Sequence, residues 1–457
     1  MTQGRLRKAI EEYTGTDPLP MHMPGHKRNP AFGSDIFSYD ITEIEGFDNL
    51  HKPRGIFADA EKKTAGVYGA RRSYLMVNGA TGGILSVIMA AAKPGGVLAI
   101  HSSCHISVWH AAELAGCRVV PIRPAIQEGL PFYGAVTADA VKQVIINTPG
   151  VCAVIITSPT YEGVMSNTGE IFDVTDKAGI PLIVDAAHGA HLGLSDRFAP
   201  APSCDADIVS LHKTLPAPTQ TAAVNLFTDK ISHSSVEHYI DVFESSSPSY
   251  ILSDGAVSCI DQIREDKVPF DKWANALESE IYGPLSSLQN LRLYSAPDHD
   301  ISKIVILCNG IKLSRHLRND FNIECEAAYP THLIAMTGAG DTVESLARFK
   351  EAVLASDLPG YASPAAFPVL SCPDKVTPVS IRDALAEGTI KLPVEQCVNR
   401  ISAEYVFGYP PGVPILIPGE LITEEIVRSI GKASDFRMSL TLSGRRDWDK
   451  TLCCLDD

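Results

Sequence analysis

Short apolar runs alternate with helix-like stretches through the first half of this chain. Such runs between amphipathic segments are typical of buried strands in βαβ units, whose sheet is largely parallel and covered on both faces. Residues 106–115 and 170–178 predict helices between the runs. The pattern therefore predicts an α/β fold with a mainly parallel sheet. The predicted strands are Gly96–Ile100, Val151–Ile156, Pro181–Val184, Ala206–Val209 and Ala222–Phe227.

The second half has a different pattern. Residues 231–290 are helical and connective in character. Strand-like runs follow at Lys303–Cys308 and His332–Met336, with a helix near Thr342–Leu354. From about Pro373 the chain is richer in proline and glycine. We expect a smaller α+β domain in this half.

A chain of 457 residues is too long for one simple domain, given about 100–200 residues per domain. The changes of pattern predict four segments. They are an N-terminal arm at residues 1–30, a large domain at 31–260, linker helices with a small α+β domain at 261–370, and a C-terminal region at 371–457.

Composition and charge narrow the class of protein. Hydrophobic residues make up 45% and charged residues 20%, which is ordinary for a globular protein. The formal net charge of −15 argues against a nucleic-acid-binding surface, which needs a basic stripe, and it suits an enzyme with a cationic substrate. No apolar run approaches the roughly 18 residues of a membrane span, and the charged start lacks a secretory signal.

The 11 cysteines are odd in number and irregular in spacing. This pattern argues against both a disulfide framework and a zinc site, so we expect no metal. Reduced thiols are typical of the cytoplasm, which is the expected location.

Polar residues follow three of the predicted strands. Ligands of open α/β sheets bind beyond the carboxyl ends of the strands. Thr157–Thr160, Asp185 with His188, and Ser210–Lys213 occupy those positions. We expect them to meet in one crevice.

Lys213 is the first candidate for covalent chemistry. A lysine reacts with an aldehyde only when its amine is neutral, which requires desolvation or nearby positive charge. Lys213 follows an apolar strand and His212. The alternative is a surface lysine at a strand end.

Asp185 ends the run Pro-Leu-Ile-Val-Asp. An ionised carboxylate at the end of a buried strand costs several kcal/mol unless it is paired. A protonated pyridine nitrogen is a suitable partner and would strengthen the ring as an electron sink. The alternative is a helix N-cap before Ala-Ala-His.

The turn Gly79–Gly83 precedes an apolar helix. A glycine turn that opens a helix presents backbone N–H groups and the positive end of a dipole to a phosphate. Thr81 adds a hydroxyl. The turn is neither GxxxxGK[ST] nor GxGxxG, and glycine turns before helices are common, so the signal is weak alone.

His105 follows another predicted strand, where its flat ring can stack on a planar cofactor. The alternative is a polar helix start capped by Ser102 or Ser103. Ser210 and His212 can donate to a phosphate beside Lys213, although a lone histidine is more often structural. Together the candidates supply what pyridoxal 5'-phosphate (PLP) requires: a phosphate cradle, a ring-face group, a carboxylate and a lysine.

At this point the chain resembles the Orn/Lys/Arg decarboxylase family in its short form, with the PLP fold of aspartate aminotransferase. The resemblance covers nearly the whole chain. The matching segments are His22–Lys27, Asp40–His51, Val77–Thr81, Thr157–Tyr161, Asp185–His191, Ser210–Pro216, Thr219–Thr221, Tyr409–Pro414 and Pro418–Glu420.

The resemblance implies a role for each candidate. Lys213 is the Schiff-base lysine, Asp185 the partner of the ring nitrogen, and His105 the histidine stacked on the ring. His188 lies on the reacting side of the cofactor. The phosphate contacts are Gly79, Ala80, Thr81, Ser210 and His212.

The resemblance also implies a bacterial homodimer with active sites at the subunit interface, near the N-terminal arm. The chain lacks the N-terminal wing domain of the long acid-inducible forms, so we expect a general-metabolism enzyme of polyamine biosynthesis that is not decameric.

Some residues depart from the family pattern. The family usually has Glu at Ala186, Thr at Leu211 and Ser at Ala80, and Asn-Ala-His-Lys-Ser where this chain has Ser103-Cys104-His105-Ile106-Ser107. The hydroxyl lost at Ala80 corresponds to about 1 kcal/mol of phosphate binding. These changes bear on substrate and rate.

The expected reaction is decarboxylation of a basic amino acid, with Lys213 or His188 returning a proton to Cα. The sequence leaves open whether the substrate is arginine, lysine or ornithine. One alternative is transamination or racemisation on the same fold, and another is a catalytically weak PLP-binding regulator. An aminotransferase needs an arginine to hold the substrate carboxylate, and the candidates are Arg315, Arg318, Arg348, Arg382 and Arg400.

Overall fold

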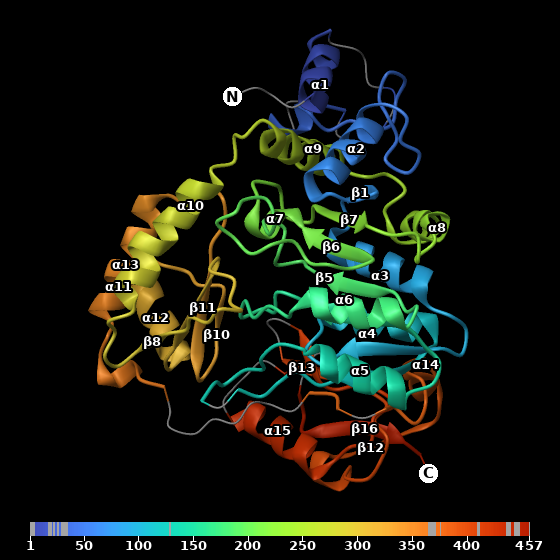
Figure 1. Cartoon of the computed structure of the whole chain (residues 1–457), viewed down its shortest axis with the longest axis vertical. Coiled ribbons are helices and arrows are strands. Elements are labelled where there is room, and N and C mark those ends of the chain that lie inside the picture. The colour runs from blue at the N-terminus through green and yellow to red at the C-terminus, as the bar shows by residue number, and fades with distance from the viewer. Residues whose placement is uncertain are drawn as a thin grey trace. The chain divides into compact units, whose positions relative to one another are not determined.

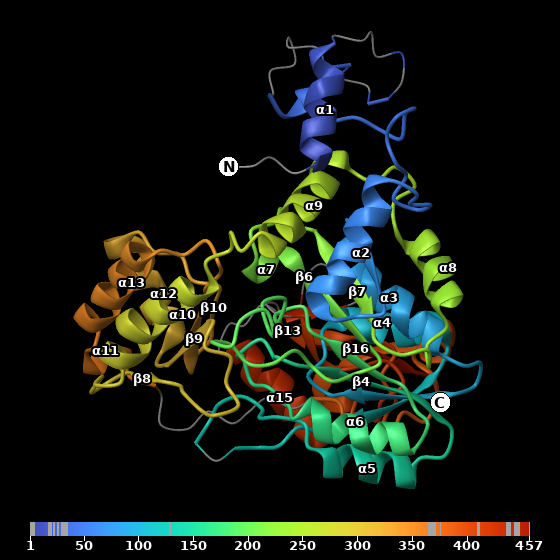
Figure 2. The same cartoon turned by 45° about the horizontal axis from the view of Figure 1, so that its top comes forward.

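The computed structural model shows an α/β protein (Figures 1 and 2). It describes residues 5–16, 21, 23–24, 27–28, 35–127, 129–363, 372–374, 376–408, 412–435, 440–442 and 448–456. Much of the predicted arm at residues 1–30, and residues 409–411 of the proline-rich motif, lie outside this part.

Seven strands form the main sheet in the order β1-β7-β6-β5-β4-β2-β3. The pairs β2–β3, β2–β4 and β4–β5 are parallel, which confirms the predicted α/β fold. β7 is the exception, because it runs antiparallel to both β1 and β6. The link at residues 211–221 is short, whereas a parallel return needs a crossover of about a dozen residues or more.

The chain divides into two compact units. The first consists of Met1–Ala90, Ala186–Phe270 and Gly338–Gly340, and the second of Ala91–Asp185, Asp271–Thr337 and Asp341–Asp457. The four segments predicted from the sequence follow a different criterion and stay a prediction.

The first unit carries three strands of the main sheet. β6 and β7 are buried along their whole length, and helices α1 and α2 pack against α9. Its elements are α1 (Arg5–Gly15), η2 (Asp35–Ser38), α2 (Ile56–Tyr68), β1 (Arg72–Met76), α3 (Gly79–Ala91), β6 (Ala206–Ser210), α7 (Leu211–Thr214), β7 (Ala222–Leu226), α8 (His233–Phe243) and α9 (Tyr250–Arg264).

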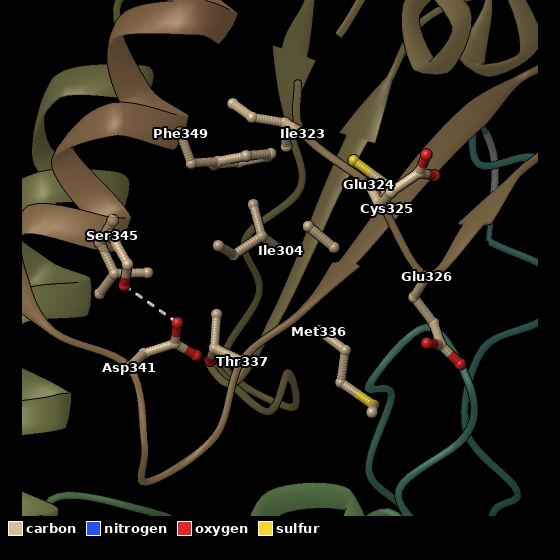
Figure 3. A pocket seen from close by; sticks show the side chains of 12 residues that line it. Ile304, Ile323, Glu324, Cys325, Glu326, Met336, Thr337, Asp341, Ser345 and Phe349 are labelled. Atoms are coloured by element: carbon tan, nitrogen blue, oxygen red, sulfur yellow. Dashed lines mark hydrogen bonds between the residues drawn. The ribbon is translucent and has the colours of Figure 1, made fainter. Parts of the chain in front are cut away.

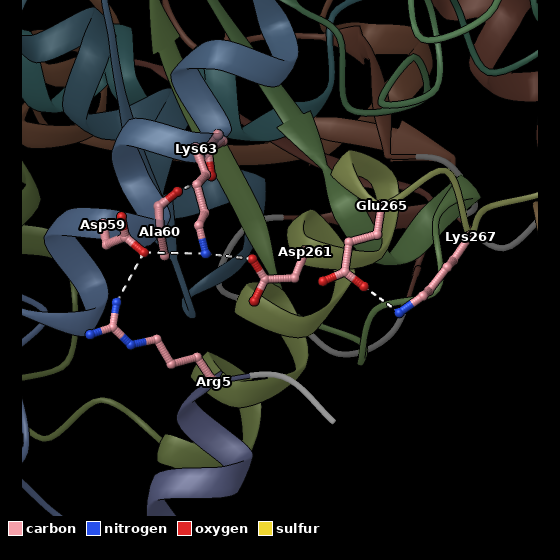
Figure 4. A network of polar contacts seen from close by, with 8 residues as sticks. Arg5, Asp59, Ala60, Lys63, Asp261, Glu265 and Lys267 are labelled. Atoms are coloured by element: carbon pink, nitrogen blue, oxygen red, sulfur yellow. Dashed lines mark hydrogen bonds and ion pairs between the residues drawn. The ribbon is translucent and has the colours of Figure 1, made fainter. Parts of the chain in front are cut away.

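Charged side chains join these three helices (Figure 4). Lys63 of α2 lies 2.7 Å from Asp261 of α9 and 3.2 Å from Asp59, and Asp59 lies 3.3 Å from Arg5 of α1. Partly exposed pairs of this kind contribute at most about 1 kcal/mol each. They therefore orient the helices more than they stabilise the fold.

The second unit begins with the parallel strands and their helices. The predicted helix at residues 106–115 and the strand after residue 151 are confirmed. These elements are β2 (Val97–His101), α4 (Ile106–Ala115), β3 (Arg118–Ile122), α5 (Ala138–Asn147), β4 (Val151–Thr157), α6 (Thr168–Lys177) and β5 (Leu182–Asp185).

A four-stranded sheet with the order β10-β11-β9-β8 follows in the same unit. It corresponds to the α+β part expected from the sequence, and α12 packs against β11. The elements are α10 (Phe270–Ala276), the π-helical η3 (Leu277–Tyr282), α11 (Gly283–Leu285), β8 (Arg292–Leu293), β9 (Lys303–Leu307), α12 (Gly310–Phe321), β10 (Ala327–Ala328), β11 (His332–Met336), α13 (Val343–Ala355) and η4 (Pro359–Tyr361).

The C-terminal part of the second unit contains two small antiparallel sheets, β12-β16 and β14-β13-β15. Buried side chains from α15 and from both sheets form its own hydrophobic core. The elements are α14 (Ile381–Ala386), β12 (Thr389–Pro393), η5 (Val394–Gln396), β13 (Val406–Gly408), β14 (Val413–Leu416), α15 (Glu424–Asp435), β15 (Leu440–Leu442) and β16 (Thr451–Leu455).

Neither a membrane-spanning helix nor a cluster of metal-binding side chains is present among the described residues. No helix there is long and apolar enough to cross a membrane. Those residues also contain no group of three His, Cys, Asp or Glu side chains that could hold a metal ion. All eleven cysteines are free thiols.

Candidate active site

Lys213 lies just beyond the carboxyl end of a buried strand, as predicted. β6 ends at Ser210 and the four-residue helix α7 begins at once. Leu211 is fully buried, and its carbonyl accepts a hydrogen bond of 3.0 Å from Leu215 N, which closes the turn. The apolar anchor fixes the helix, so the lysine two residues later has a defined direction.

The Lys213 amine meets the imidazole of His188. Lys213 Nζ lies 2.9 Å from His188 Nε2. A hydrogen bond between two nitrogens needs one N–H and one lone pair, and a charged ammonium has no lone pair. Either the lysine is neutral or the facing nitrogen of His188 is unprotonated. The pair can therefore exchange a proton and produce the neutral amine that attack on an aldehyde requires.

His188 is held by a tight turn after β5. Ala186 N donates to Ile208 O of β6 at 3.0 Å, and Gly189 N donates to Ala186 O at 2.8 Å. Tyr68 Oη donates to Ala190 O at 2.9 Å, which fixes the far side of the turn. Residues 186–191 are not helical, so the alternative role of Asp185 as a helix N-cap is wrong.

The Gly79 turn opens helix α3, as the sequence predicted. Gly79 has φ +72°, a conformation that favours glycine, and its N–H donates to Gln220 O at 2.8 Å. A Cβ on Gly83 would lie 2.7 Å from Val224 Cγ2 and 3.0 Å from Ile208 Cγ2, so glycine lets α3 pack closely on β6 and β7. The N-terminus of α3 is thereby held beside the strand that leads to Lys213.

The first turn of an α-helix has N–H groups without intrahelical partners, which suits an anion. In α3 this turn contains Ala80 and Thr81, and Thr81 is exposed. Ser210 is buried at the end of β6. The donors fit a phosphate group, because they combine backbone N–H groups with hydroxyls at a helix start.

His212 is tied to the same neighbourhood. Its Nδ1 lies 3.0 Å from Thr221 O, and the preceding carbonyl, Gln220 O, receives the Gly79 N–H. Because a carbonyl only accepts, Nδ1 carries the proton. Burial and the positive charge of Lys213 lower the pKa of His212. A neutral ring of this tautomer has only a lone pair at Nε2, so His212 must take up a proton before it can donate to a phosphate.

Asp185 is the last residue of β5 and is buried. It is paired in register with Thr157 of β4, and its carbonyl accepts from Ser158 N at 3.1 Å. Thr157 Oγ1 donates to Cys104 Sγ at 3.2 Å. Burial raises the pKa of the Cys104 thiol, and the Asp185 carboxylate raises it further. The predicted Thr157–Thr160 segment and Asp185 are therefore neighbours at two adjacent strand ends.

His105 caps helix α4 with its own side chain. His105 Nδ1 accepts from Ser107 N at 3.2 Å, which fixes the ring, so the alternative of a Ser102 or Ser103 cap is wrong. Ile106 N donates to Gly412 O at 2.9 Å, and a Cβ on Gly412 would lie 3.6 Å from the His105 ring. Sequence reasoning missed this contact. Its signal was the glycine of the Tyr-Pro-Pro-Gly motif, which was noted without a role.

The structure thus joins Lys213, His188, His212 and the Gly79 turn through contacts within the first unit. Asp185 and His105 belong to the second unit, and Asp185 precedes His188 by only three positions in the chain.

Two segments of the chain match the two domains of one known protein family. Residues 5–277 match the major domain of the Orn/Lys/Arg decarboxylases, and residues 369–438 match their C-terminal domain. The chain belongs to the Orn/Lys/Arg decarboxylase family. This confirms the predicted family and the predicted class of enzyme, a PLP-dependent decarboxylase of a basic amino acid.

Curated relatives match over more than nine-tenths of this chain. An arginine decarboxylase of Bacillus subtilis is 27% identical over 94% of this chain and 93% of its own. An arginine decarboxylase of Halalkalibacterium halodurans is 28% identical over 97% and 96%. The inducible lysine decarboxylase of Escherichia coli is 23% identical over 92% of this chain and 75% of its own.

Solved structures share the fold. A lysine decarboxylase of Francisella novicida superimposes with a TM-score of 0.83 at 17% identity, over 99% of this chain and 81% of its own. An aminotransferase of Bacillus subtilis superimposes with a TM-score of 0.54 at 14% identity, over 66% of this chain and 86% of its own. These likenesses confirm the predicted fold of PLP-dependent transferases.

Three departures from the family pattern lie in the packed interior. Ala186, Leu211 and Cys104 are each 0% exposed. Their side chains therefore contact the core of the protein rather than open solvent. Ala186 and Leu211 therefore place apolar side chains in the core where the family usually has polar ones.

Two of the arginines considered for a transamination site have other partners. Arg318 is exposed and pairs with Glu324 at 2.5 Å, and the Arg348 guanidinium donates to Phe321 O at 2.7 Å. The Arg382 guanidinium packs against Gly116, where a Cβ would collide with it.

A cavity of about 400 Å³ lies in the four-stranded part of the second unit (Figure 3). Asp341 accepts from Ser345 Oγ at 3.0 Å at its edge. None of the predicted site residues lines it. The lining residues are Ile304, Ile323, Glu324, Cys325, Glu326, Ala335, Met336, Thr337, Asp341, Ser345, Leu346 and Phe349.

Proposed function

We propose that this protein decarboxylates arginine, with PLP held by Lys213. The observation that carries the proposal is the contact of 2.9 Å between Lys213 Nζ and His188 Nε2 at the carboxyl end of a buried strand. A lysine beside a base at that position has the proton acceptor that covalent attachment of an aldehyde requires.

PLP, when bound, supplies the electron sink that receives the bonding electrons as CO₂ leaves the substrate. Lys213 would hold the cofactor covalently. His188 would exchange a proton with the Lys213 amine, and one of the two would return a proton to Cα. The contact between the two nitrogens supports this division, because it lets either group act as the acid.

The phosphate is assigned to the Gly79 turn. Ala80 and Thr81 offer N–H groups at the helix start, and Ser210 adds a hydroxyl. His212 contributes after taking up a proton. The hydrogen bond from Gly79 N to Gln220 O supports the assignment, because it holds the turn beside the strand end that leads to Lys213.

Asp185 is assigned to the ring nitrogen and His105 to the ring face. Both assignments rest on the family pattern. The buried Asp185 carboxylate would keep a proton on the nitrogen, since a buried anion requires a positive partner. The fixed ring of His105 supports a stacking role.

The choice of arginine rests on the relatives. The two arginine decarboxylases compared above match this chain over more than nine-tenths of both lengths, whereas the lysine decarboxylase of Escherichia coli matches over 75% of its own. The net charge of −15 also suits a cationic substrate.

The test is release of labelled CO₂ from carboxyl-labelled arginine, lysine and ornithine, with chromatography of the amine product. Arginine should give the highest kcat/KM and agmatine. A preference for lysine or ornithine would overturn the substrate and leave the class intact. Conversion to a keto acid without CO₂, or binding of PLP without any turnover, would contradict decarboxylation by this chain.

The protein is further proposed to act as a cytoplasmic homodimer in polyamine synthesis, as the family resemblance implies. Eleven free thiols support a reducing compartment. Sedimentation equilibrium of the purified protein should give twice the chain mass of 49.1 kDa. A monomer at micromolar concentration would contradict the dimer.

A further inference from the structure

A buried carboxylate braces the chain just before the Gly79 turn. Glu244 is 6% exposed and follows helix α8. Its Oε2 accepts from Val77 N at 3.0 Å and from Asn78 N at 3.3 Å, and its Oε1 accepts from Ser245 N at 3.2 Å. Asn78 Nδ2 donates to Phe243 O at 2.9 Å. The two residues that lead into the turn are therefore fixed to the end of α8.

His51 places positive charge near this carboxylate. Its Nδ1 lies 3.0 Å from Asp241 Oδ1, and its Nε2 lies 2.7 Å from Ser245 O. A carbonyl oxygen and a carboxylate oxygen only accept, so both ring nitrogens carry protons and the ring is cationic. Burial lowers the pKa of His51, but these contacts and the charges of Asp241 and Glu244 together outweigh burial and raise the pKa above its ordinary value.

This arrangement explains a motif that the sequence left without a role. The segment Asp40–His51 matched the family, and His51 is its last residue. His51 contacts Asp241 and Ser245, which lie before and after Glu244 in the chain. Glu244 in turn contacts the link between strand and helix at residues 77–78. The motif is connected in this way to the phosphate turn far along the chain.

The charges of Glu244 and His51 are compatible with a phosphate site at the Gly79 turn. An anion beside a phosphate site weakens phosphate binding unless a cation offsets it. His51 supplies that cation. Glu244 uses the N–H groups of Val77 and Asn78, so those of the first turn of α3 stay available to the phosphate.

We propose that Glu244 is a positioning residue for the cofactor phosphate, and that His51 supports it by holding Glu244 and the end of α8 in place. Glu244 does not touch the phosphate itself. It fixes the backbone of Val77 and Asn78, so that the Ala80 and Thr81 N–H groups point to one place. This inference rests on the phosphate assignment in the proposed function.

The test compares two cofactors that differ only in the phosphate. The equilibrium affinities of wild type and Glu244→Gln for PLP and for pyridoxal are measured by absorbance titration of the cofactor-free protein. Gln keeps the size of the side chain but loses one acceptor oxygen and the charge. We expect PLP to bind roughly 10- to 100-fold more weakly and pyridoxal to bind unchanged. A general loss of structure would weaken both cofactors alike.

Asp357→Asn is the matched control. Asp357 also accepts backbone N–H groups, from Gln289, Asn290 and Leu291, but it lies in the second unit. The ratio of PLP affinity to pyridoxal affinity should stay at the wild-type value in this variant.

His51→Gln is the second variant, because His51 lies near the surface and its replacement is better tolerated than that of a buried carboxylate. It should lower the same ratio by a smaller factor. An unchanged ratio in Glu244→Gln, or in His51→Gln if the first does not fold, would overturn the inference. Wild type that binds neither cofactor would instead overturn the proposed function.

Discussion

The Gly79 turn and the Lys213 segment both follow a buried strand of the first unit, yet in the proposed site they would hold the cofactor in different ways. Gly79 opens a helix of 13 residues whose backbone N–H groups are the useful atoms. Lys213 lies on a helix of four residues whose side chains are the useful atoms. A backbone cradle must be held from outside, whereas a reactive side chain needs a neighbour that sets its protonation.

The contacts of the two regions follow this difference. The Gly79 turn is braced by Gln220 and, through Val77 and Asn78, by Glu244. Lys213 contacts the imidazole of His188. A carboxylate in that place would stabilise the ammonium, which is the unreactive form, so an imidazole suits the chemistry better.

The largest effect is expected at Lys213. If Lys213 has the role proposed above, Lys213→Ala removes both the covalent attachment and one of the two proton carriers, so turnover should fall by more than about 10⁴-fold. The absorbance band of covalently bound cofactor should also disappear. Lys177→Ala, at an exposed lysine of α6, should behave as wild type. A band that persists in Lys213→Ala would show that another lysine holds the cofactor.

The next effect is expected at His188. His188→Gln keeps a polar group beside Lys213 but removes the titratable nitrogen, so kcat should fall by about 10²- to 10⁴-fold while the cofactor stays attached. Steady-state kinetics and the cofactor spectrum check both parts. The control is His238→Gln, at an exposed histidine of α8. An unchanged kcat would mean that Lys213 works without this partner.

A smaller effect is expected from strain in the backbone cradle. Gly79→Ala places a Cβ at φ +72°, which costs roughly 1–2 kcal/mol of unfolding free energy without a steric collision. Gly69→Ala, at φ +66° with open space around it, should lose the same stability. PLP affinity should fall only in Gly79→Ala, as measured by titration beside urea unfolding. Equal PLP affinity in the two variants would show that the Gly79 turn does not bind the phosphate.

The smallest effect is expected at His212, between the two regions. Its lowered pKa means that the folded protein binds fewer protons than the unfolded chain below pH of about 6.5, so the free energy of unfolding falls as pH drops. In His212→Gln the urea midpoint should fall less between pH 7.5 and 5.5 than in wild type. A steeper fall in the variant would mean that the pKa is raised instead.

The strand ends could be predicted because buried parallel strands are nearly continuous apolar runs. β6 ends at Ser210, one residue beyond the predicted run, and β5 ends at Asp185. The rule that ligands bind beyond the carboxyl ends then pointed to Lys213 and His188. The antiparallel direction of β7 could not be predicted from the sequence, because strand direction depends on pairing and not on the composition of the apolar run.

The residues that hold the site segments in place could not be predicted in the same way. Gln220, Glu244 and Gly412 lie far along the chain from the residues that they hold. Gln220 and Gly412 act through backbone carbonyls, which carry no sequence signature. Glu244 acts through its carboxylate, but the groups that it binds are backbone N–H groups distant in sequence. The His105 cap was missed for a different reason. Serine is the commoner residue at a helix start, so Ser102 and Ser103 were expected to cap α4.

The sequence by itself determined the α/β fold, the family and the residue types that a PLP enzyme requires, because burial and side-chain chemistry are properties of individual residues. Only the tertiary structure decided that His188 meets Lys213, that Nδ1 of His212 is already used by Thr221, and that Glu244 braces the Gly79 turn. These contacts join residues distant in sequence, and their hydrogen bonds depend on directions that exist only after the chain has folded.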